Sequence, residues 1–193
     1  METLVKKNRK QQIEETATNL FRERGYAATS MRDLAQVLGI EAASLYSHIK
    51  SKEEILQKIC FRMADEFFEA WKGVESENSS FAAKMKKAAI AHVTVITKDT
   101  AASAVFFNEW RHLSEPFLSE FLTMRNDYEG RFIQIIEEGI NSGEFETVDT
   151  HFTMLTILSS LNWTHNWYKP QGSLTPDEVG TRLSELILNG LKK

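Results

Sequence analysis

Small and polar side chains gather in the segment EAASLYSH, residues 41–48. Its hydroxyl, imidazole and carboxylate groups match the donors and acceptors that base edges and phosphates present in DNA. Such groups act together only if one surface presents them side by side. The segment therefore predicts a nucleic-acid contact, provided that a helix turns these side chains outward.

The residues just before this segment have the apolar spacing of a short helix. Hydrophobic side chains recur every three or four positions from Met31 to Leu38, and Gly39 follows them. Glycine ends a helix there because it takes a left-handed backbone without steric cost. Leu45 lies where a second short helix would face the first. This is the pattern of a helix-turn-helix, whose second helix enters the major groove of DNA; a plain helical hairpin in an all-α core is the alternative.

Different parts of this unit are expected to contact different parts of DNA. The second helix lies nearest the base edges, Tyr46 and Lys52 hold phosphates, and groups just before the first helix add hydroxyl or amide contacts. The predicted DNA-binding residues are Thr29, Ser30, Arg32, Glu41, Ala42, Ser44, Leu45, Tyr46, Ser47, His48 and Lys52.

Residues 9–56 resemble the amino-terminal domain of TetR-family transcriptional repressors. The matching pieces are IEETATNLFRERGYAATSMRDLAQVLGI and ASLYSHIKSKEEIL. Phe21, Gly25 and Tyr26 match the step that ends the family's first helix, whereas Ile49 stands where the family usually has Phe. The resemblance implies a transcriptional repressor, and the helix-turn-helix framework with its outward polar face predicts that it binds a palindromic operator as a homodimer.

The charge of the chain is divided unevenly along its length. The 193 residues carry a net charge of −4, yet residues 1–60 hold ten Lys and Arg against eight Asp and Glu, while residues 61–193 hold thirteen against nineteen. Phosphate repels an acidic body, so this division helps to turn the basic end toward DNA. Because the sequence shows neither a signal-peptide pattern nor a long apolar run, we expect a cytoplasmic protein with no membrane partner.

Helical spacing continues to the end of the chain, and no segment shows the alternation of a strand. We therefore expect an all-α fold of about nine helices. A three-helix helix-turn-helix DNA-binding domain is predicted for residues 1–51, and a helical ligand-binding and dimerisation domain for residues 52–193. A long helix capped by Ser51, with Glu54 at the capping-box position, runs past Trp71 and links the two.

The last two predicted helices carry more apolar residues than one buried face needs. A four-helix bundle formed by two copies of the chain would bury the excess, and a two-fold dimer also suits the reading of two operator half-sites. Plain intramolecular core is the alternative. The predicted dimer interface is Leu155, Leu158, Leu183, Leu186 and Ile187.

Large aromatic side chains are concentrated in the middle helices, with polar residues between them. Polar groups are costly to bury without partners, so a largely apolar cavity with a few polar anchors accounts for both, although ordinary core is the alternative. The predicted lining is Phe106, Trp110, Arg111, Phe117, Phe121, Asn162, Trp163, Asn166 and Trp167.

The segments FFNEWRHL and NWTHNWYKPQGSLTPDEV resemble the regulatory domain of TetR-family members that sense acyl-CoA thioesters. The resemblance implies an acyl chain among the aromatic side chains and a cationic anchor for the CoA phosphates, with Arg111 as the candidate. Binding of this effector is expected to release the operator. A drug-like or aromatic effector, or no effector, is the alternative.

Nothing in the sequence favours an enzyme. It has no Gly-x-Ser-x-Gly, no glycine-rich phosphate loop and no His-Glu-x-x-His, and its five histidines lie in separate segments without metal-ligand spacing. No catalytic residue, metal or cofactor is therefore expected. The single cysteine, Cys60, falls on an apolar face and is expected to be a buried, inert thiol.

Overall fold

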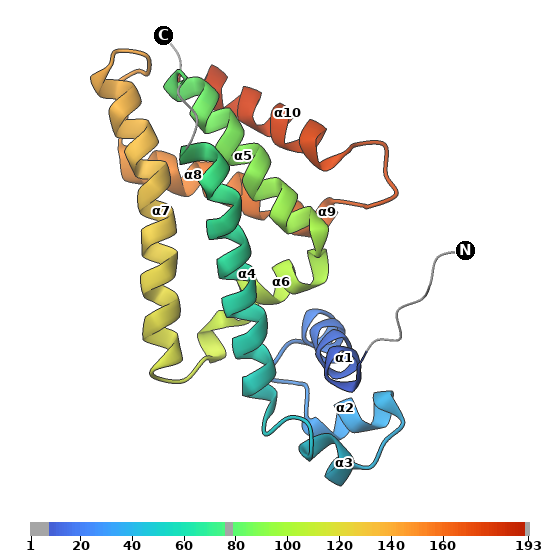
Figure 1. Cartoon of the computed structure of the whole chain (residues 1–193). Coiled ribbons are helices and arrows are strands. Elements are labelled where there is room, and N and C mark those ends of the chain that lie inside the picture. The colour runs from blue at the N-terminus through green and yellow to red at the C-terminus, as the bar shows by residue number, and fades with distance from the viewer. Residues whose placement is uncertain (1–7, 76–78, 192–193) are drawn as a thin grey trace.

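The computed structural model describes residues 8–75 and 79–191, and these residues form helices joined by short connections (Figure 1). The helices are α1 (Arg9–Arg24), α2 (Met31–Leu38), α3 (Ala42–Tyr46), α4 (Lys52–Glu75), α5 (Phe81–Lys98), α6 (Thr100–Glu109), the 3-10 turn η1 (Trp110–His112), α7 (Phe117–Asn141), α8 (Thr150–Asn162), α9 (Thr164–Trp167) and α10 (Pro176–Asn189). The described residues include no strand, which confirms the all-α prediction.

Two of the predicted helices are each divided in the structure. Helical spacing predicts one helix over residues 101–113 and another over residues 148–168; the end of the first winds as η1, and the second becomes α8 and α9. The second break lies at Trp163. The backbone carbonyl of the preceding residue, Asn162, accepts a 2.7 Å hydrogen bond from Nδ1 of His165. Because the side chain occupies this carbonyl, the chain turns before the short α9 begins.

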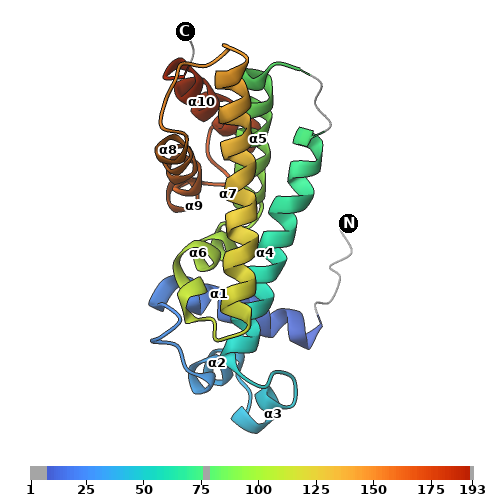
Figure 2. The same ribbon diagram turned by 90° about the vertical axis from the view of Figure 1, so that its left-hand side faces the viewer.

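The molecule is elongated, with α1, α2 and α3 at one end and α8 and α10 toward the other (Figures 1 and 2). Helix α4 starts beside α3 and runs into the body, next to the long α7. Ser51 caps it as predicted, accepting the backbone N–H of Glu54 at 3.1 Å. A capping box has a second bond, in which the Glu54 carboxylate accepts the N–H of Ser51. This prediction is wrong, because the Glu54 carboxylate accepts the N–H of Lys50 instead. No helix of the described residues is long and apolar enough to cross a membrane.

One continuous apolar face of α4 packs in two hydrophobic cores. Its first turns, from Ile55 to Phe67, pack with α1, α2, α3 and α6, whereas Trp71 and Val74 pack with α5, α7, α8 and α10. Each fully buried side chain of this kind contributes about 1.5–3 kcal/mol. The predicted domain boundary after residue 51 therefore lies at the start of α4, a helix that packs in both cores.

Helix α10 lies against α5 at an unusually close crossing. A Cβ atom added to Gly180 would lie 2.7 Å from Cα of Ile90, closer than real atoms approach. Only a glycine lets the two backbones meet here, and Ser184 one turn later is also fully buried. This crossing fixes where α10 lies beside α8, and so fixes the surface that the two helices share.

Candidate functional site

Two local devices shape the helix-turn-helix. Ser30 begins α2 with a capping box: its hydroxyl accepts the N–H of Asp33 at 3.2 Å, and the Asp33 carboxylate accepts the N–H of Ser30 at 2.7 Å. Gly39 ends α2 with φ 64°, the left-handed conformation that glycine favours. The chain then turns into α3, whose Leu45 is fully buried against the rest of the unit.

The predicted DNA-binding residues differ in how deeply they are buried. Ser30, Arg32, Glu41, Ser44, Tyr46 and Ser47 are exposed, and Ala42, His48 and Lys52 are half-buried. Leu45, named among the DNA-binding residues, is instead fully buried and anchors α3 to the core, in agreement with its predicted position facing the first helix of the pair. Thr29 is likewise buried, and its hydroxyl donates to the carbonyl of Gly25 at 2.9 Å, so it stabilises the turn rather than offering a free group.

Lys52 ties the turn before α2 to the start of α4. Its Nζ donates to the carbonyls of Tyr26 at 2.7 Å and Thr29 at 2.9 Å, and it lies 4.2 Å from the centroid of the Tyr26 ring. An ammonium has three donors, so one remains for a phosphate. The side chain thus has a structural role that the sequence did not reveal.

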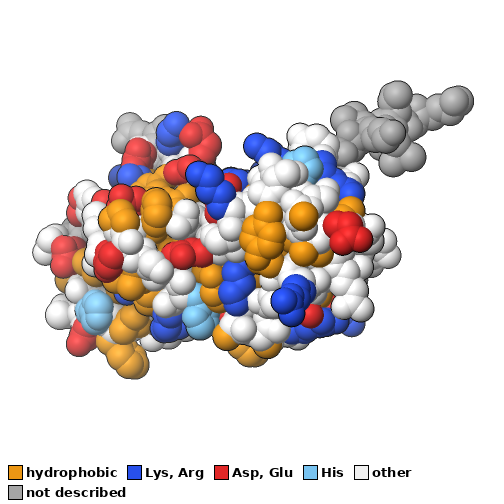
Figure 3. Space-filling model, turned by 90° about the horizontal axis from the view of Figure 1, so that it is seen from below, with side chains coloured by type: hydrophobic (Ala, Val, Ile, Leu, Met, Phe, Trp, Pro, Cys, Tyr) orange, Lys and Arg blue, Asp and Glu red, His pale blue; other side chains and the backbone are white. Residues whose placement is uncertain are grey.

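A shallow hollow of about 650 Å³ runs along this end of the molecule, between residues 27–32 and residues 46–52. Arg32, Tyr46, Lys50 and Lys52 line it. Seen from this end, acidic side chains are sparse around the helix-turn-helix and more frequent on the other half of the molecule (Figure 3). Lys50 was absent from the predicted contacts, although its charge directly after α3 was a usable signal.

A second hollow, the aromatic cavity, lies between α4, α5, α6, α7 and α8 and has a volume of about 90 Å³. Four predicted residues line it: Phe106, Trp110, Phe121 and Asn162. The prediction missed Phe67, His92, Arg125 and Tyr128, which also line it, because they lie on helices whose packing order the sequence does not give.

The other five predicted lining residues lie outside the cavity. The break between α8 and α9 turns Thr164 and His165 inward, which leaves Trp163, Asn166 and Trp167 exposed. Phe117 is at the surface, where its ring packs edge-on against Phe61. Arg111 is exposed as well, but its guanidinium lies 4.5 Å from the ring centroid of Trp110, beside the cavity.

A chain of three polar side chains is built into the aromatic cavity. Asn162 Oδ1 can only accept, so Nε2 of His92 donates to it at 2.8 Å, and Nδ1 of His92 accepts from the hydroxyl of Tyr128 at 2.9 Å. Burial lowers the pKa of His92 to about 4 against the opposing effect of the Asn162 bond, and burial raises the pKa of Tyr128. All three groups are therefore neutral near pH 7.

Charged groups lie at the edge of the cavity. Arg125 and Glu129 are one turn apart on α7 and line it, with Nε of Arg125 3.4 Å from the Glu129 carboxylate. The Arg125 guanidinium lies 4.9 Å from the Trp110 ring centroid, so two arginines share this one indole. Such cation–π contacts hold both guanidiniums close to the mouth of the cavity.

The turn η1 connects the cavity to the helix-turn-helix. Two residues after Trp110, His112 stacks on the ring of Tyr26, with centroids 5.0 Å apart and an interplanar angle of 26°. The N–H of Ser114 then donates to the carboxylate of Glu53 at 2.8 Å. A displacement of Trp110 would therefore reach the turn before α2 and the first turn of α4.

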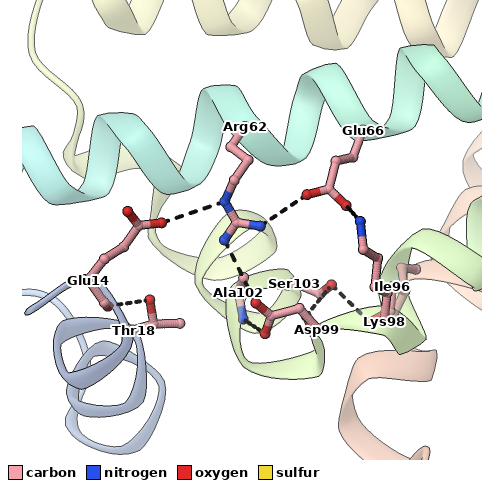
Figure 4. Close-up of polar contacts among 9 residues, drawn as sticks. All are labelled: Glu14, Thr18, Arg62, Glu66, Ile96, Lys98, Asp99, Ala102 and Ser103. Atoms are coloured by element: carbon pink, nitrogen blue, oxygen red, sulfur yellow. Dashed lines mark hydrogen bonds and ion pairs between the residues drawn. The ribbon is translucent and has the colours of Figure 1, made fainter. Parts of the chain in front are cut away.

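Arg62 of α4 forms a second connection (Figure 4). Its guanidinium lies 3.5 Å from Glu14 of α1, 3.1 Å from Glu66 and 3.7 Å from Asp99, which caps α6. Glu66 also accepts from Lys98 of α5 at 2.8 Å. Arg62 thus links α4 to α1 of the DNA-binding unit and to the cap of α6, and Glu66 extends the network to α5.

The predicted dimer residues differ in how far they are exposed. Leu155 and Leu186 are exposed, at 45% and 72%, on α8 and α10, whereas Leu183 and Ile187 are half-buried. Leu158 was wrongly placed at the interface, because it is buried inside its own chain and lines the cavity. Phe152, which is 68% exposed, completes the α8–α10 face together with a hollow of about 570 Å³.

No cluster of three or more side chains that could hold a metal occurs among the described residues. Cys60 is fully buried in the core, as the sequence predicted, and burial raises the pKa of its thiol to about 12. This keeps the thiol protonated and unreactive.

Comparison with known proteins identifies the family. Residues 13–59 match the model of bacterial regulatory proteins of the tetR family. Residues 78–191, more than half of the chain, match the model of the tetracyclin repressor-like C-terminal domain. The chain belongs to the TetR family. The resemblance seen in residues 9–56 is thereby confirmed, and the protein is a DNA-binding transcriptional repressor of this family.

Individual relatives extend the similarity over the full length. The HTH-type transcriptional repressor KstR2 of Rhodococcus jostii is 28% identical, and the match covers 98% of this chain and 94% of the relative. The structure of the ketosteroid transcriptional regulator KstR2 of Mycobacterium tuberculosis superposes with a TM-score of 0.88 at 26% identity, covering 96% of each chain. AibR, solved with isovaleryl coenzyme A and operator DNA, shares the fold with a TM-score of 0.78 at 23% identity, over 93% of this chain and 97% of that one.

The buried His92 predicts an acid-sensitive fold. Its pKa of about 4 in the folded protein lies below the ordinary value of 6.5, so the unfolded chain takes up a proton first as the pH falls. From this group the free energy of unfolding should fall by about 1.5 kcal/mol between pH 6.5 and pH 5.0, and further until the pH reaches about 4.

Urea unfolding at these pH values measures the effect. A His92→Gln variant should lose this part of the slope, whereas His151→Gln, which removes an exposed imidazole, should keep it. Equal slopes in the parent and the His92 variant would contradict the assignment.

Proposed function

We propose that this protein is an effector-responsive repressor that binds a palindromic operator as a homodimer and leaves it when an apolar effector, foremost an acyl-CoA, enters the aromatic cavity. One observation carries the proposal: the cavity is walled by α4 and η1, and both also pack against the helix-turn-helix. A ligand there acts on the same elements that position α3.

The DNA contacts proposed for this chain surround the hollow at its basic end. The exposed face of α3 lies nearest the base edges, while Arg32, Tyr46, Lys50 and the remaining donor of Lys52 hold the phosphates on either side. Each phosphate neutralised by a cation releases counterions, so binding weakens steeply as salt rises. The contribution of a single lysine to phosphate binding can therefore be measured from the salt dependence of operator affinity.

Lys50→Ala should lower operator affinity and reduce the slope of log affinity against log salt by about 1. Lys72→Ala is the matched control, because it removes the same charge from an exposed position near the far end of α4. Fluorescence anisotropy with a labelled operator at several salt concentrations gives both slopes. A slope that changes equally in both variants would mean that Lys50 touches no phosphate.

The homodimer is proposed to form through the α8–α10 face. The exposed apolar side chains Phe152, Leu155 and Leu186 lie on this face beside its hollow, and soluble monomers rarely leave such groups together in water. A two-fold pair through this face places two copies of α3 on one duplex. Half-sites about 34 Å apart or further need that rigid spacing.

Leu186→Lys should convert the dimer to monomers and abolish tight operator binding, because each monomer reads only one half-site. Val37→Lys is the control, since Val37 is also an exposed aliphatic residue, at 56%, but lies on α2 away from this face. Sedimentation equilibrium reports the mass of each variant. A Leu186→Lys protein that remains dimeric would move the interface elsewhere.

The size of the cavity supports control by an effector. Ligand pockets usually have volumes of about 300–1,000 Å³, and the present cavity of about 90 Å³ is much smaller. A larger ligand must therefore push α4 and α7 apart, which favours a second position of α4 and of the α3 that precedes it. Two arginines, Arg111 and Arg125, lie at the mouth, where they can pair with phosphates. AibR, a protein of the same fold, was solved with isovaleryl coenzyme A and operator DNA, which supports an acyl-CoA as the effector.

Saturating acyl-CoA should weaken operator binding by about 5- to 150-fold, the usual range for effectors, and should change the fluorescence of Trp110. Arg125→Gln should raise the acyl-CoA concentration needed, while leaving operator affinity in its absence unchanged. Free CoA is the control, because it lacks the apolar part. If acyl-CoAs of several lengths leave both signals unchanged, the effector is of another class and only the repressor assignment stands.

A further inference from the structure

The three polar side chains in the aromatic cavity form an incomplete hydrogen-bond chain. Tyr128 donates to His92 and His92 donates to Asn162, so the imidazole has both of its nitrogens occupied. The side-chain amide nitrogen of Asn162 has no protein acceptor within the described part of the chain. Because Asn162 lines the cavity, this N–H group is a neutral donor available to a ligand, whereas the other lining donor without a hydrogen-bond partner, Nε of Arg125, is charged.

None of these three cavity side chains carries a charge near pH 7. His92 is 3% exposed and neutral near pH 7, and the Tyr128 hydroxyl keeps its proton. The charged side chains that line the cavity, Arg125 and Glu129, lie together on α7; Nε of Arg125 is 3.4 Å from the Glu129 carboxylate but has no hydrogen-bond partner among the described residues. A carboxylate buried beside Asn162 would therefore have no cation within this triad, which makes its burial costly.

We propose that Asn162, held by His92 and Tyr128, binds an uncharged carbonyl oxygen carried on the apolar body of the effector. This inference rests on the proposed function only in taking the cavity as the effector site. The Asn162 amide donates to the carbonyl, His92 fixes the orientation of the amide, and the aromatic walls contact the carbon skeleton. Anionic groups of the effector then lie at the mouth, beside Arg125 and Arg111.

Packing alone is the competing explanation of the triad. Its members come from α5, α7 and α8, so the bonds also hold three helices together. A purely structural network would change stability when cut, but would not distinguish a carbonyl from a hydrocarbon of the same shape. Ligand selectivity therefore separates the two explanations.

Three probes on one bicyclic skeleton test the proposal: 2-decalone, 2-methylenedecalin and decahydronaphthalene-2-carboxylate. Their dissociation constants are measured on the full-length protein by tryptophan fluorescence, without DNA. The ratio of the ketone constant to the methylene constant is compared between variants, because this comparison cancels the solvation of the probes. The carboxylate should bind at least about 100-fold more weakly than the ketone.

Asn162→Leu removes the amide at similar volume and should reduce the preference for the ketone by about tenfold. Tyr128→Phe should reduce it less than about threefold, since the Tyr128 hydroxyl is used by His92. Leu188→Met, at a buried apolar position of α10 outside the cavity lining, should leave the preference unchanged. Thermal melts show that each variant is folded, and Tyr128→Phe and the carboxylate probe remain informative if Asn162→Leu is not.

The outcomes also separate this inference from the proposed function. An unchanged ketone preference in folded Asn162→Leu, a carboxylate that binds as tightly as the ketone, or no binding by any probe would each overturn the inference. Operator release by acyl-CoA could still be observed in all three cases. Conversely, a ketone preference that behaves as expected, together with acyl-CoA that leaves operator affinity unchanged, supports the carbonyl site and contradicts release by acyl-CoA.

Discussion

The structure depends on the burial of one continuous apolar face of α4. Its amino-terminal turns complete the core of the DNA-binding unit, and its last turns, with Trp71 and Val74, belong to the core of the regulatory body. Because no flexible linker separates the two parts, they cannot move independently without loss of buried contacts. A change in the position of α4 must therefore move α3, which precedes it by a few residues.

Two further contacts restrict how α4 can move. Arg62 joins it to α1 and α6 through carboxylates, and η1 joins the cavity to Tyr26 through the stacked His112. Both Arg62 and His112 are partly accessible to solvent, so these contacts are of modest strength. A weak contact suits a regulator, since an effector supplies only about 1–3 kcal/mol of coupling free energy.

The distribution of charge in the regulatory body separates two kinds of recognition. Neutral hydrogen-bonding groups lie among the aromatic side chains inside, where burial keeps His92 and Tyr128 uncharged. The guanidiniums of Arg111 and of Arg125, which also lines the cavity, lie against the Trp110 ring, where both side chains are in part exposed and solvent lowers the cost of a charge. An effector with an apolar body and an anionic end is complementary to both regions at once.

The sequence by itself determined the helices and the helix-turn-helix. Apolar spacing, the capping residue Ser30 and the turn at Gly39 are local signals, so α2 and α3 were predicted at nearly their observed bounds, and the family followed from the same residues. The tertiary structure alone decided which side chains meet. Leu45 was predicted as a contact but is buried as an anchor, and Trp163 was predicted inside but is turned outward by the break after α8. His92, Tyr128 and Asn162 lie on separate helices, 36 and 70 residues apart from His92 in sequence, and no local pattern connects them. Helical spacing gives the face on which a residue lies, whereas the partner of that face depends on how all the helices pack together.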